Sequence, residues 1–230
     1  MKKLKFCLLF FFHISISFQS EAQLKQFQKW YVGGSWGYSR VPLDGFNDHL
    51  AKQTLGSSIK PFGLINDFQI LSGDVIFRDS KDLGLRLFAD YYSNSTETKS
   101  ESGLSTFTRS VSSFDLGVQV LWFLTQDYFG SQLMLGFGGA VMLPLIEEKN
   151  DFPPNSFNDD SDYKFDNISG GAHFSLIGMI PVYQKWLFKM EGCYRFSRSS
   201  TFFEVNKNSQ LNADIELTGF IGKVGFLYEF

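Results

Sequence analysis

The sequence has 230 residues, of which 27 are Phe, 21 are Gly and 20% are charged, and its formal net charge is −3. This length suits one large or two small domains, and a chain so rich in Phe and Gly favours a β fold over a helical one. The mild acidity and the lack of a basic cluster argue against a nucleic-acid partner.

The first 22 residues have the layout of a signal peptide. KKLK supplies a basic n-region, CLLFFFHISISF an apolar h-region, and SEAQ a small-residue cleavage site. We therefore expect residues 1–22 to be removed and residues 23–230 to form the mature domain. Removal takes away three lysines and one glutamate, a charge of +2, and leaves −5. Cys193 is then the single cysteine of the mature chain, so no intramolecular disulfide is expected.

The mature chain divides into segments of alternating hydrophobicity, and this period of two predicts β-strands. In SFDLGVQVLWF, for example, apolar residues from Phe114 to Trp122 share one face, opposite Asp115 and Gln119. No later segment approaches the roughly 20 apolar residues that a membrane-spanning helix needs. The predicted strands are residues 29–40, 66–79, 82–96, 107–125, 128–146, 165–183, 186–202 and 211–230.

The connections between these strands alternate between short and long. Short turns are predicted around DSKD (79–82), TQDY (125–128) and VYQKW (182–186), and long polar stretches separate the other strands. An even number of strands, with short turns at one end and long loops at the other, is typical of bacterial outer-membrane barrels. We therefore expect an all-β fold, an eight-stranded antiparallel up-and-down transmembrane β-barrel with both termini on the periplasmic side.

The apolar register carries two rows of aromatic residues, which we interpret as the girdles of such a barrel. The row at the short-turn end comprises Trp30, Trp122, Tyr183, Trp186 and Tyr228, and the row eight residues along comprises Tyr38, Phe114, Tyr194 and Phe220. Eight residues at about 3.3 Å each, on strands tilted by roughly 40°, span on the order of 20 Å, close to the roughly 25 Å apolar belt of outer-membrane barrels.

The opposite register is charged and is predicted to face the lumen. Its ionisable residues are Asp74, Arg78, Arg86, Asp90, Asp115, Lys189, Glu191, Arg195, Lys223 and Glu229, five acidic and five basic, together with His173. An eight-stranded barrel has room inside only for side chains, and buried charges must pair. We expect a salt-bridged plug without a water-filled pore, in which inward glycines such as Gly117 and Gly136 make room for long cationic side chains.

The signal peptide, the eight alternating strands, the short turns and the final FLYEF together resemble the outer membrane protein beta-barrel domain family common in Bacteroidetes, which includes PorT-like proteins. More loosely, the chain resembles the barrel half of outer-membrane protein A. The resemblance implies the outer membrane of a Gram-negative cell, contact with outer-membrane lipid, and recognition by the barrel-assembly machinery. The assembly signal would correspond to Phe226, Tyr228 and Phe230. No cofactor is expected.

His173, Ser175 and Glu191 invite comparison with lipid A 3-O-deacylases, eight-stranded outer-membrane enzymes that use a His, a Ser and an acidic residue. The register, however, places His173 and Ser175 inside the barrel, away from a lipid substrate. In addition, Leu176 stands where an Asn is expected after the serine. We therefore favour a hydrogen-bonded histidine in the polar plug.

The third long loop contains NDDSDYKFDN, whose Asp159, Asp160, Asp162 and Asp166 could ligate calcium through hard oxygen atoms. The spacing lacks the ordered ligand pattern and the glycine of a calcium loop. A solvated acidic loop is the preferred interpretation, because Asp and Asn are common in loops for conformational reasons. No metal site is predicted.

The sequence thus predicts a non-enzymatic barrel with a structural or accessory role, whose loops or turns meet a protein partner that the sequence does not identify. Two alternatives stay open. One is a conduit for small hydrophobic molecules, with a lateral opening beside the short, glycine-rich first strand, and the other is a lipid A-modifying enzyme. A soluble lipocalin-type barrel is the alternative fold, and it would carry its apolar residues inside.

Overall fold

The computed structural model describes residues 28–41, 65, 67–99, 105–125, 130–151, 161–199, 202–204, 210–211 and 215–230. The predicted signal peptide and two of the four aspartates of the predicted acidic loop, Asp159 and Asp160, lie outside this described part. Among the described residues, no helix is long and apolar enough to cross a membrane.

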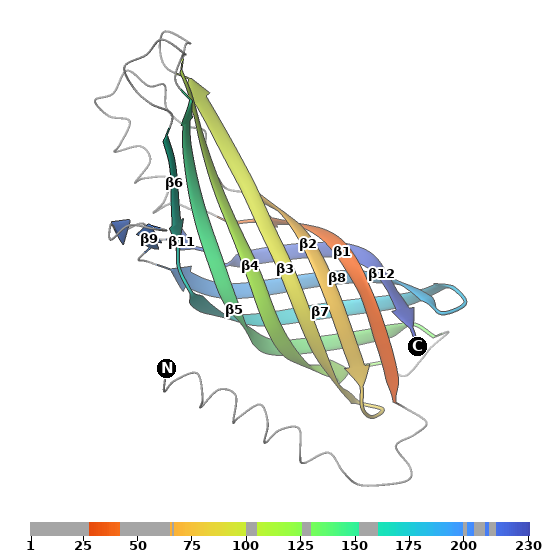
Figure 1. The fold of residues 1–230 in the computed structure, drawn as a ribbon. Helices are drawn as coiled ribbons and strands as arrows, with labels where there is room; N and C mark the ends of the chain where they lie inside the picture. Colours follow the sequence, from red (N-terminus) through yellow and green to blue (C-terminus); the bar gives the residue numbers. More distant parts are fainter. Residues whose placement is uncertain are drawn as a thin grey trace.

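Eight long strands form a closed barrel (Figure 1). They are β1 (Lys29–Arg40), β2 (Asp67–Arg78), β3 (Leu83–Lys99), β4 (Thr106–Phe123), β5 (Gln132–Asp151), β7 (Ser169–Tyr183), β8 (Trp186–Ser199) and β12 (Gly219–Glu229). Each pairs antiparallel with its neighbour in this order, and β12 returns to β1. The structure confirms the predicted eight-stranded antiparallel barrel.

Strands β1 and β12 close the barrel along a continuous seam. Ten residue pairs join them, from Tyr31 opposite Glu229 to Arg40 opposite Phe220. Gly225 allows this close approach, because a Cβ at this position would collide with the carbonyl oxygen of Gly34 on the facing strand. The lateral opening that the conduit hypothesis requires is not present along this seam.

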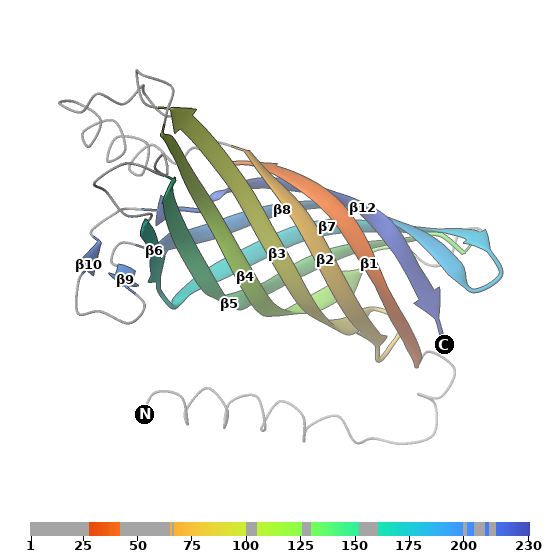
Figure 2. The ribbon, with the colours of Figure 1, turned by 45° about the horizontal axis from the view of Figure 1, so that its top comes forward.

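The short connections from β2 to β3 and from β7 to β8 lie at the end of the barrel that also holds the C-terminus (Figures 1 and 2). Between β2 and β3, the backbone N–H groups of Asp79 and Ser80 donate to the carbonyl oxygen of Leu83. Gln184 and Lys185 alone separate β7 from β8, and Gln184 adopts a positive φ of 45°, as tight hairpin turns require. We call this the turn end, and we call the opposite end the loop end.

At the loop end the sheet continues beyond the barrel wall (Figure 2). β3, β4 and β5 protrude there, and four short strands complete the fold: β6 (Ser161–Asp166), β9 (Phe202–Glu204), β10 (Gln210–Leu211) and β11 (Ile215–Glu216). β6 pairs with β5, β9 with β6, and β10 with β9.

This extension corrects the predicted strand limits. The sequence prediction ended two strands at residues 96 and 146, whereas β3 runs to Lys99 and β5 to Asp151. Cross-strand ion pairs hold the polar extensions in strand form: the Arg109 Nε lies 3.0 Å from Glu148 Oε1, and the Lys164 Nζ lies 2.7 Å from Glu147 Oε1.

Two of the other predicted strands are interrupted. The predicted strand 165–183 breaks at residues 167–168, between β6 and β7, and the predicted strand 211–230 becomes β11 and β12. β5 begins at Gln132, and residues 128 and 129 of the predicted strand lie outside the described part of the chain. A strand ends where its neighbouring strand no longer pairs with it, and the alternation of apolar residues along one segment does not show where that is.

Candidate functional site

The lumen is filled by three layers of side chains. An apolar cluster occupies the turn end: Tyr31, Ile76, Leu121, Phe123, Met134, Ile177, Met179, Leu187 and Leu227. A second occupies the loop end: Val41, Ile65, Phe68, Ile70, Tyr92, Val111, Met142, Ile146, Cys193, Leu217 and Ile221. Ionised groups lie between them, as the inward residues of β12 illustrate: Ile221, then Lys223, then Leu227.

Arg86 is the centre of the charged layer and is itself 1% exposed. Its Nε donates to Asp74 Oδ1 on β2 over 2.7 Å, and its Nη1 donates to Gln119 Oε1 on β4 over 2.8 Å. Across the lumen, Nη1 and Nη2 donate to the two carboxylate oxygens of Glu191 on β8 over 2.7 and 2.8 Å. One guanidinium group therefore binds three strands other than its own, with the two-pronged geometry that favours Arg over Lys.

Two lysines complete this network. The Lys189 Nζ bridges Asp74 and Glu191, lying 3.0 Å from Glu191 Oε2. The Lys223 Nζ lies 2.6 Å from Asp90 Oδ2, and Asp90 also accepts hydrogen bonds from the hydroxyl groups of Ser72 and Tyr92. Every carboxylate in this part of the lumen therefore has a cationic partner, which compensates for the cost of its burial.

A separate pair lies closer to the loop end. The Arg195 Nη1 donates to Asp115 Oδ2 over 2.8 Å, and its Nε donates to the backbone oxygen of Leu217 over 2.8 Å. The Arg195 guanidinium carbon lies 4.1 Å from the centre of the Tyr92 ring, a cation–π contact. The Ser113 hydroxyl donates to Asp115 over 2.6 Å.

Eight of the ten ionisable residues predicted for the lumen thus form the charged layer, four acidic and four basic. The remaining two lie near the turn end. Arg78 donates to the backbone oxygens of Ser80 and Lys81 and lies over the Phe123 ring. Glu229 is partly exposed and pairs with Lys29 at the mouth of the barrel, with Nζ and Oε1 2.9 Å apart, so it does not belong to the plug.

Gly117 and Gly136 do not make room for the cations as predicted, whereas Gly37 does, because a Cβ on Gly37 would lie 2.7 Å from Lys223 Cγ. A Cβ on Gly117 would collide with the ring of Phe88, and one on Gly136 would meet the Ser175 hydroxyl and Gln119. Phe88 in turn lies beneath two cations, with its ring centre 5.1 Å from the Arg86 guanidinium carbon and 5.7 Å from Lys223 Nζ. Gly117 therefore admits an aromatic ring that supports the cations.

The outer wall carries the predicted aromatic residues. Trp30, Trp122, Tyr183 and Trp186 are exposed at the turn end, Tyr38, Phe114, Tyr194 and Phe220 are exposed in the row beyond, and Tyr228 is half-buried against Trp186. Of the residues that the resemblance gave as an assembly signal, Phe226 and Phe230 are also exposed on this face. Between the two rows, exposed Leu, Val and Phe side chains form an apolar wall.

His173, Ser175 and Glu191 do not form a catalytic arrangement. The Ser175 hydroxyl donates to Gln119 Oε1 over 3.2 Å, the His173 Nδ1 faces Cys193 Sγ at 3.7 Å, and Glu191 is bound by Arg86. All three side chains are buried in the lumen. The described part of the chain also holds no group of three or more His, Cys, Asp or Glu residues that could bind a metal ion.

Sequence reasoning missed the two apolar layers. It assigned the inward register as polar, although Ile76, Met134 and Leu227 belong to that register as well. A usable signal was present in the inward register of β2, where two polar residues lie between apolar ones: Phe68, Ile70, Ser72, Asp74 and Ile76. An inward register that is apolar on both sides of a polar centre indicates a lumen whose charged middle is covered toward both ends.

The comparisons with known proteins concern the fold. No family model matches the chain, and no curated protein matches it. Among solved structures, a major outer membrane protein of Thermus thermophilus matches with a TM-score of 0.56 at 10% identity, over 88% of this chain and 99% of that one. The outer membrane protein OprG of Pseudomonas aeruginosa matches with a TM-score of 0.54 at 12% identity, over 88% and 96%.

A third match is Ail, the attachment invasion locus protein of Yersinia pestis, solved in complex with the heparin analogue sucrose octasulfate. Its TM-score is 0.50 at 12% identity, over 88% of this chain and 99% of that one. Identities this low establish a common fold only. The chain has the fold of an eight-stranded outer-membrane β-barrel.

Proposed function

We propose that this protein is a non-conducting, non-enzymatic barrel of a Gram-negative outer membrane, and that its specific role lies at the loop end. The observation that carries this proposal is the three-layered lumen. The charged layer has no room for water flow, since Arg86, Lys189, Arg195 and Asp90 are each at most 1% exposed, and an apolar cluster seals it on each side.

The apolar outer wall and its aromatic rows support a position in a lipid bilayer, because a soluble barrel would carry this surface inside. The signal peptide over residues 1–22, delivery by the barrel-assembly machinery, and membership of the Bacteroidetes PorT-like family belong to the same proposal. They rest on the sequence pattern and on the barrel architecture.

The alternatives lack a structural basis in the described residues. A conduit for hydrophobic molecules requires a lumenal pocket and a parted seam, but β1 and β12 pair over ten residues and the lumen is packed. A lipid A-modifying enzyme requires a nucleophile within reach of lipid, whereas Ser175 is fully buried inside the barrel. The protruding sheet of β3, β4 and β5 offers a surface for partners at the loop end.

Conductance measurement tests this function directly. The detergent-refolded protein would be inserted into planar lipid bilayers in parallel with a sixteen-stranded porin, which has an aqueous channel. We expect no stepwise ion conductance from the barrel, while the porin gives open-channel steps. Regular steps from the wild-type barrel, at a frequency that rises with protein concentration, would overturn the proposal of a closed lumen.

A further inference from the structure

A groove of about 620 Å³ opens at the loop end where β2 stops and β3 continues. The two strands pair up to Gln69 opposite Ser93, and beyond that point β3 pairs only with β4 among the described strands. We call this space the outer groove. Its walls come from β1 to β5, and its volume lies in the range of roughly 300–1,000 Å³ that is typical of small-molecule sites.

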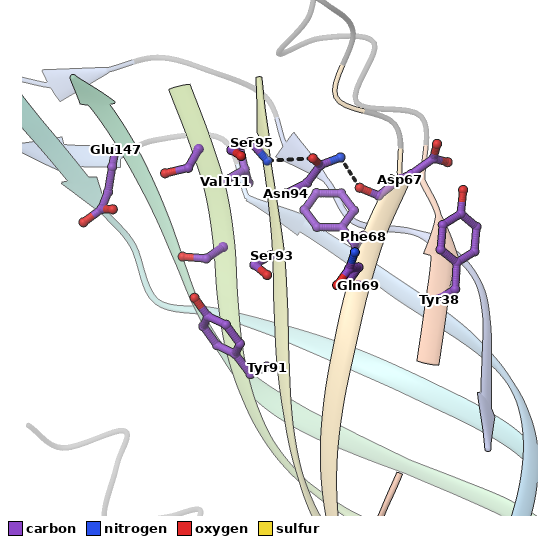
Figure 3. A pocket seen from close by; sticks show the side chains of 12 residues that line it. Tyr38, Asp67, Phe68, Gln69, Tyr91, Ser93, Asn94, Ser95, Val111 and Glu147 are labelled. Atoms are coloured by element: carbon purple, nitrogen blue, oxygen red, sulfur yellow. Dashed lines mark hydrogen bonds between the residues drawn. The ribbon is translucent and has the colours of Figure 1, made fainter. Parts of the chain in front are cut away.

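Asn94 bridges β3 and β2 at the head of the groove (Figure 3). Its side-chain Nδ2 donates to the backbone oxygen of Asp67 on β2, and its Oδ1 accepts from the backbone N–H of Ser95 over 2.6 Å. The amide side chain thus lies between the donor and the acceptor of one backbone bond, the N–H group of Ser95 and the carbonyl oxygen of Asp67. The floor of the groove is apolar and closed, because Phe68 and Val111 are each 1% exposed.

The lining has the chemistry that recognises sugars. Four serine side chains, Ser93, Ser95, Ser110 and Ser112, line it together with the amide group of Gln69. The rings of Tyr38 and Tyr91, 47% and 44% exposed, flank these polar groups. A pyranose has hydroxyl groups that both donate and accept hydrogen bonds, and it has a C–H face that packs on the electron-rich face of an aromatic ring.

The charges on the lining select a neutral ligand. Its two carboxylates are Asp67 and Glu147, and no lysine or arginine is among its described residues. One of these carboxylates already has a partner, because Glu147 pairs with Lys164. The groove therefore disfavours phosphate and sulfate groups. We propose that the outer groove binds a neutral, hydroxyl-rich oligosaccharide.

The position of the groove allows two sources for such a sugar. Tyr38 and Tyr91 lie at the loop-end aromatic row, so the groove opens where the outer wall leaves the apolar band. Sugars of a glycolipid in the outer leaflet would be at this height, and a soluble glycan could reach the same place from outside. This inference rests on one part of the proposed function, namely that the specific role of the protein lies at the loop end.

Calorimetric titration of the detergent-refolded protein distinguishes these sources. One probe is the neutral, hexose-only outer-core oligosaccharide of lipopolysaccharide, and the other is a set of neutral trisaccharides of glucose or xylose. We expect binding of at least one probe, weakened about tenfold or more in Tyr91→Ala because the aromatic contact is lost. Binding of the first probe assigns the site to a membrane glycolipid, and binding of the second to a soluble glycan.

Tyr194→Ala is the matched control, since Tyr194 belongs to the same aromatic row but lines no part of the groove. A second variant, Gln69→Ala, removes one polar group and leaves the rings in place, and the slower migration of boiled samples in SDS confirms that each variant is folded. Binding of neither probe, equal binding by Tyr91→Ala and wild type, or preference for a sulfated oligosaccharide would each overturn the inference. A barrel that conducts ions and still binds sugar would refute only the closed lumen.

Discussion

Arg86 shows how a single buried residue can organise a lumen. Its guanidinium donors reach carboxylates and an amide on three other strands, and its side chain is 1% exposed. A buried ion pair of this kind adds little stability compared with well-packed apolar groups, but removing one partner leaves a buried charge without compensation. The main effect of Arg86 is therefore to determine which strands lie opposite one another across the lumen.

Arg86→Met tests this constraint. The change leaves Asp74 with Lys189 alone, and Glu191 with Lys189 and the more distant Lys223 at 3.9 Å, so we expect the free energy of unfolding to fall by about 3–5 kcal/mol. Urea titration in detergent micelles, followed by tryptophan fluorescence, measures the loss. The double variant Arg86→Met with Glu191→Gln removes both charges, and we expect it to be more stable than Arg86→Met alone.

The comparison variant is Lys164→Met, which removes the cation of an exposed pair with Glu147. Surface pairs contribute about 0–1 kcal/mol, so this variant should unfold close to the wild type. Equal losses in Arg86→Met and Lys164→Met would show that the lumenal network contributes no more than a surface pair.

At the scale of the element, the seam between β1 and β12 depends on glycine. Gly225 faces inward on β12, and a Cβ there would collide with backbone atoms of Gly34 and Ser35. Gly222 lies three residues earlier on the same strand and faces outward, and a Cβ at that position would have no other atom within 4 Å. Alanine at either position reduces the flexibility of the backbone, but only alanine at Gly225 also lacks space for its methyl group. The two substitutions therefore distinguish these two effects.

We expect Gly225→Ala to reduce the fraction of closed barrel and Gly222→Ala to leave it unchanged. Closed barrels resist SDS until heated, so the fraction of protein that migrates differently before and after boiling measures closure. Both variants lower backbone freedom equally, and only the first requires the strands to move apart. An unaltered closed fraction in Gly225→Ala would mean that the seam tolerates a wider spacing than the structure shows.

The period of two made most of the barrel predictable from sequence, because a strand that is buried on one face fixes which residues point inward. Strand count, turn positions and the inward charges follow from that pattern. The pattern does not predict which of these charges pair with one another. Arg86 and Glu191, for example, are 105 residues apart, and the shear of the closed barrel decides that they meet. The protruding ends of β3 and β5 were also missed, because Ser-, Thr- and Glu-rich strands look like loops.

For the whole molecule, the level of the membrane can be read from two outward leucines on β3. Leu83 pairs with Trp122 in the turn-end aromatic row, whereas Leu87 pairs with Val118, midway between Trp122 and Phe114. Both leucines are exposed on the outer wall. In water the two positions would tolerate a charge equally well, but in a bilayer they lie at different depths.

Leu87→Arg should therefore cost about 2–4 kcal/mol of stability in lipid vesicles, and Leu83→Arg about 0–1 kcal/mol. Reversible urea unfolding in phosphatidylcholine vesicles gives both values. The same titrations in a soluble detergent serve as the control, where the difference should shrink. A larger cost at Leu83 than at Leu87 would place the apolar band at another height on the barrel.

The charged layer also divides the chain into two halves of opposite sign. Its members on β2 to β4 are Asp74, Arg86, Asp90 and Asp115, with a combined charge of −2, and those on β8 and β12 are Lys189, Glu191, Arg195 and Lys223, with a combined charge of +2. Four ion pairs join the halves, over separations of 80 to 133 residues. Closure of the barrel therefore neutralises both charges, whereas a closure shifted by one residue would place these side chains on the outer wall. Only the native register between the two groups of strands brings the opposite charges together inside the lumen.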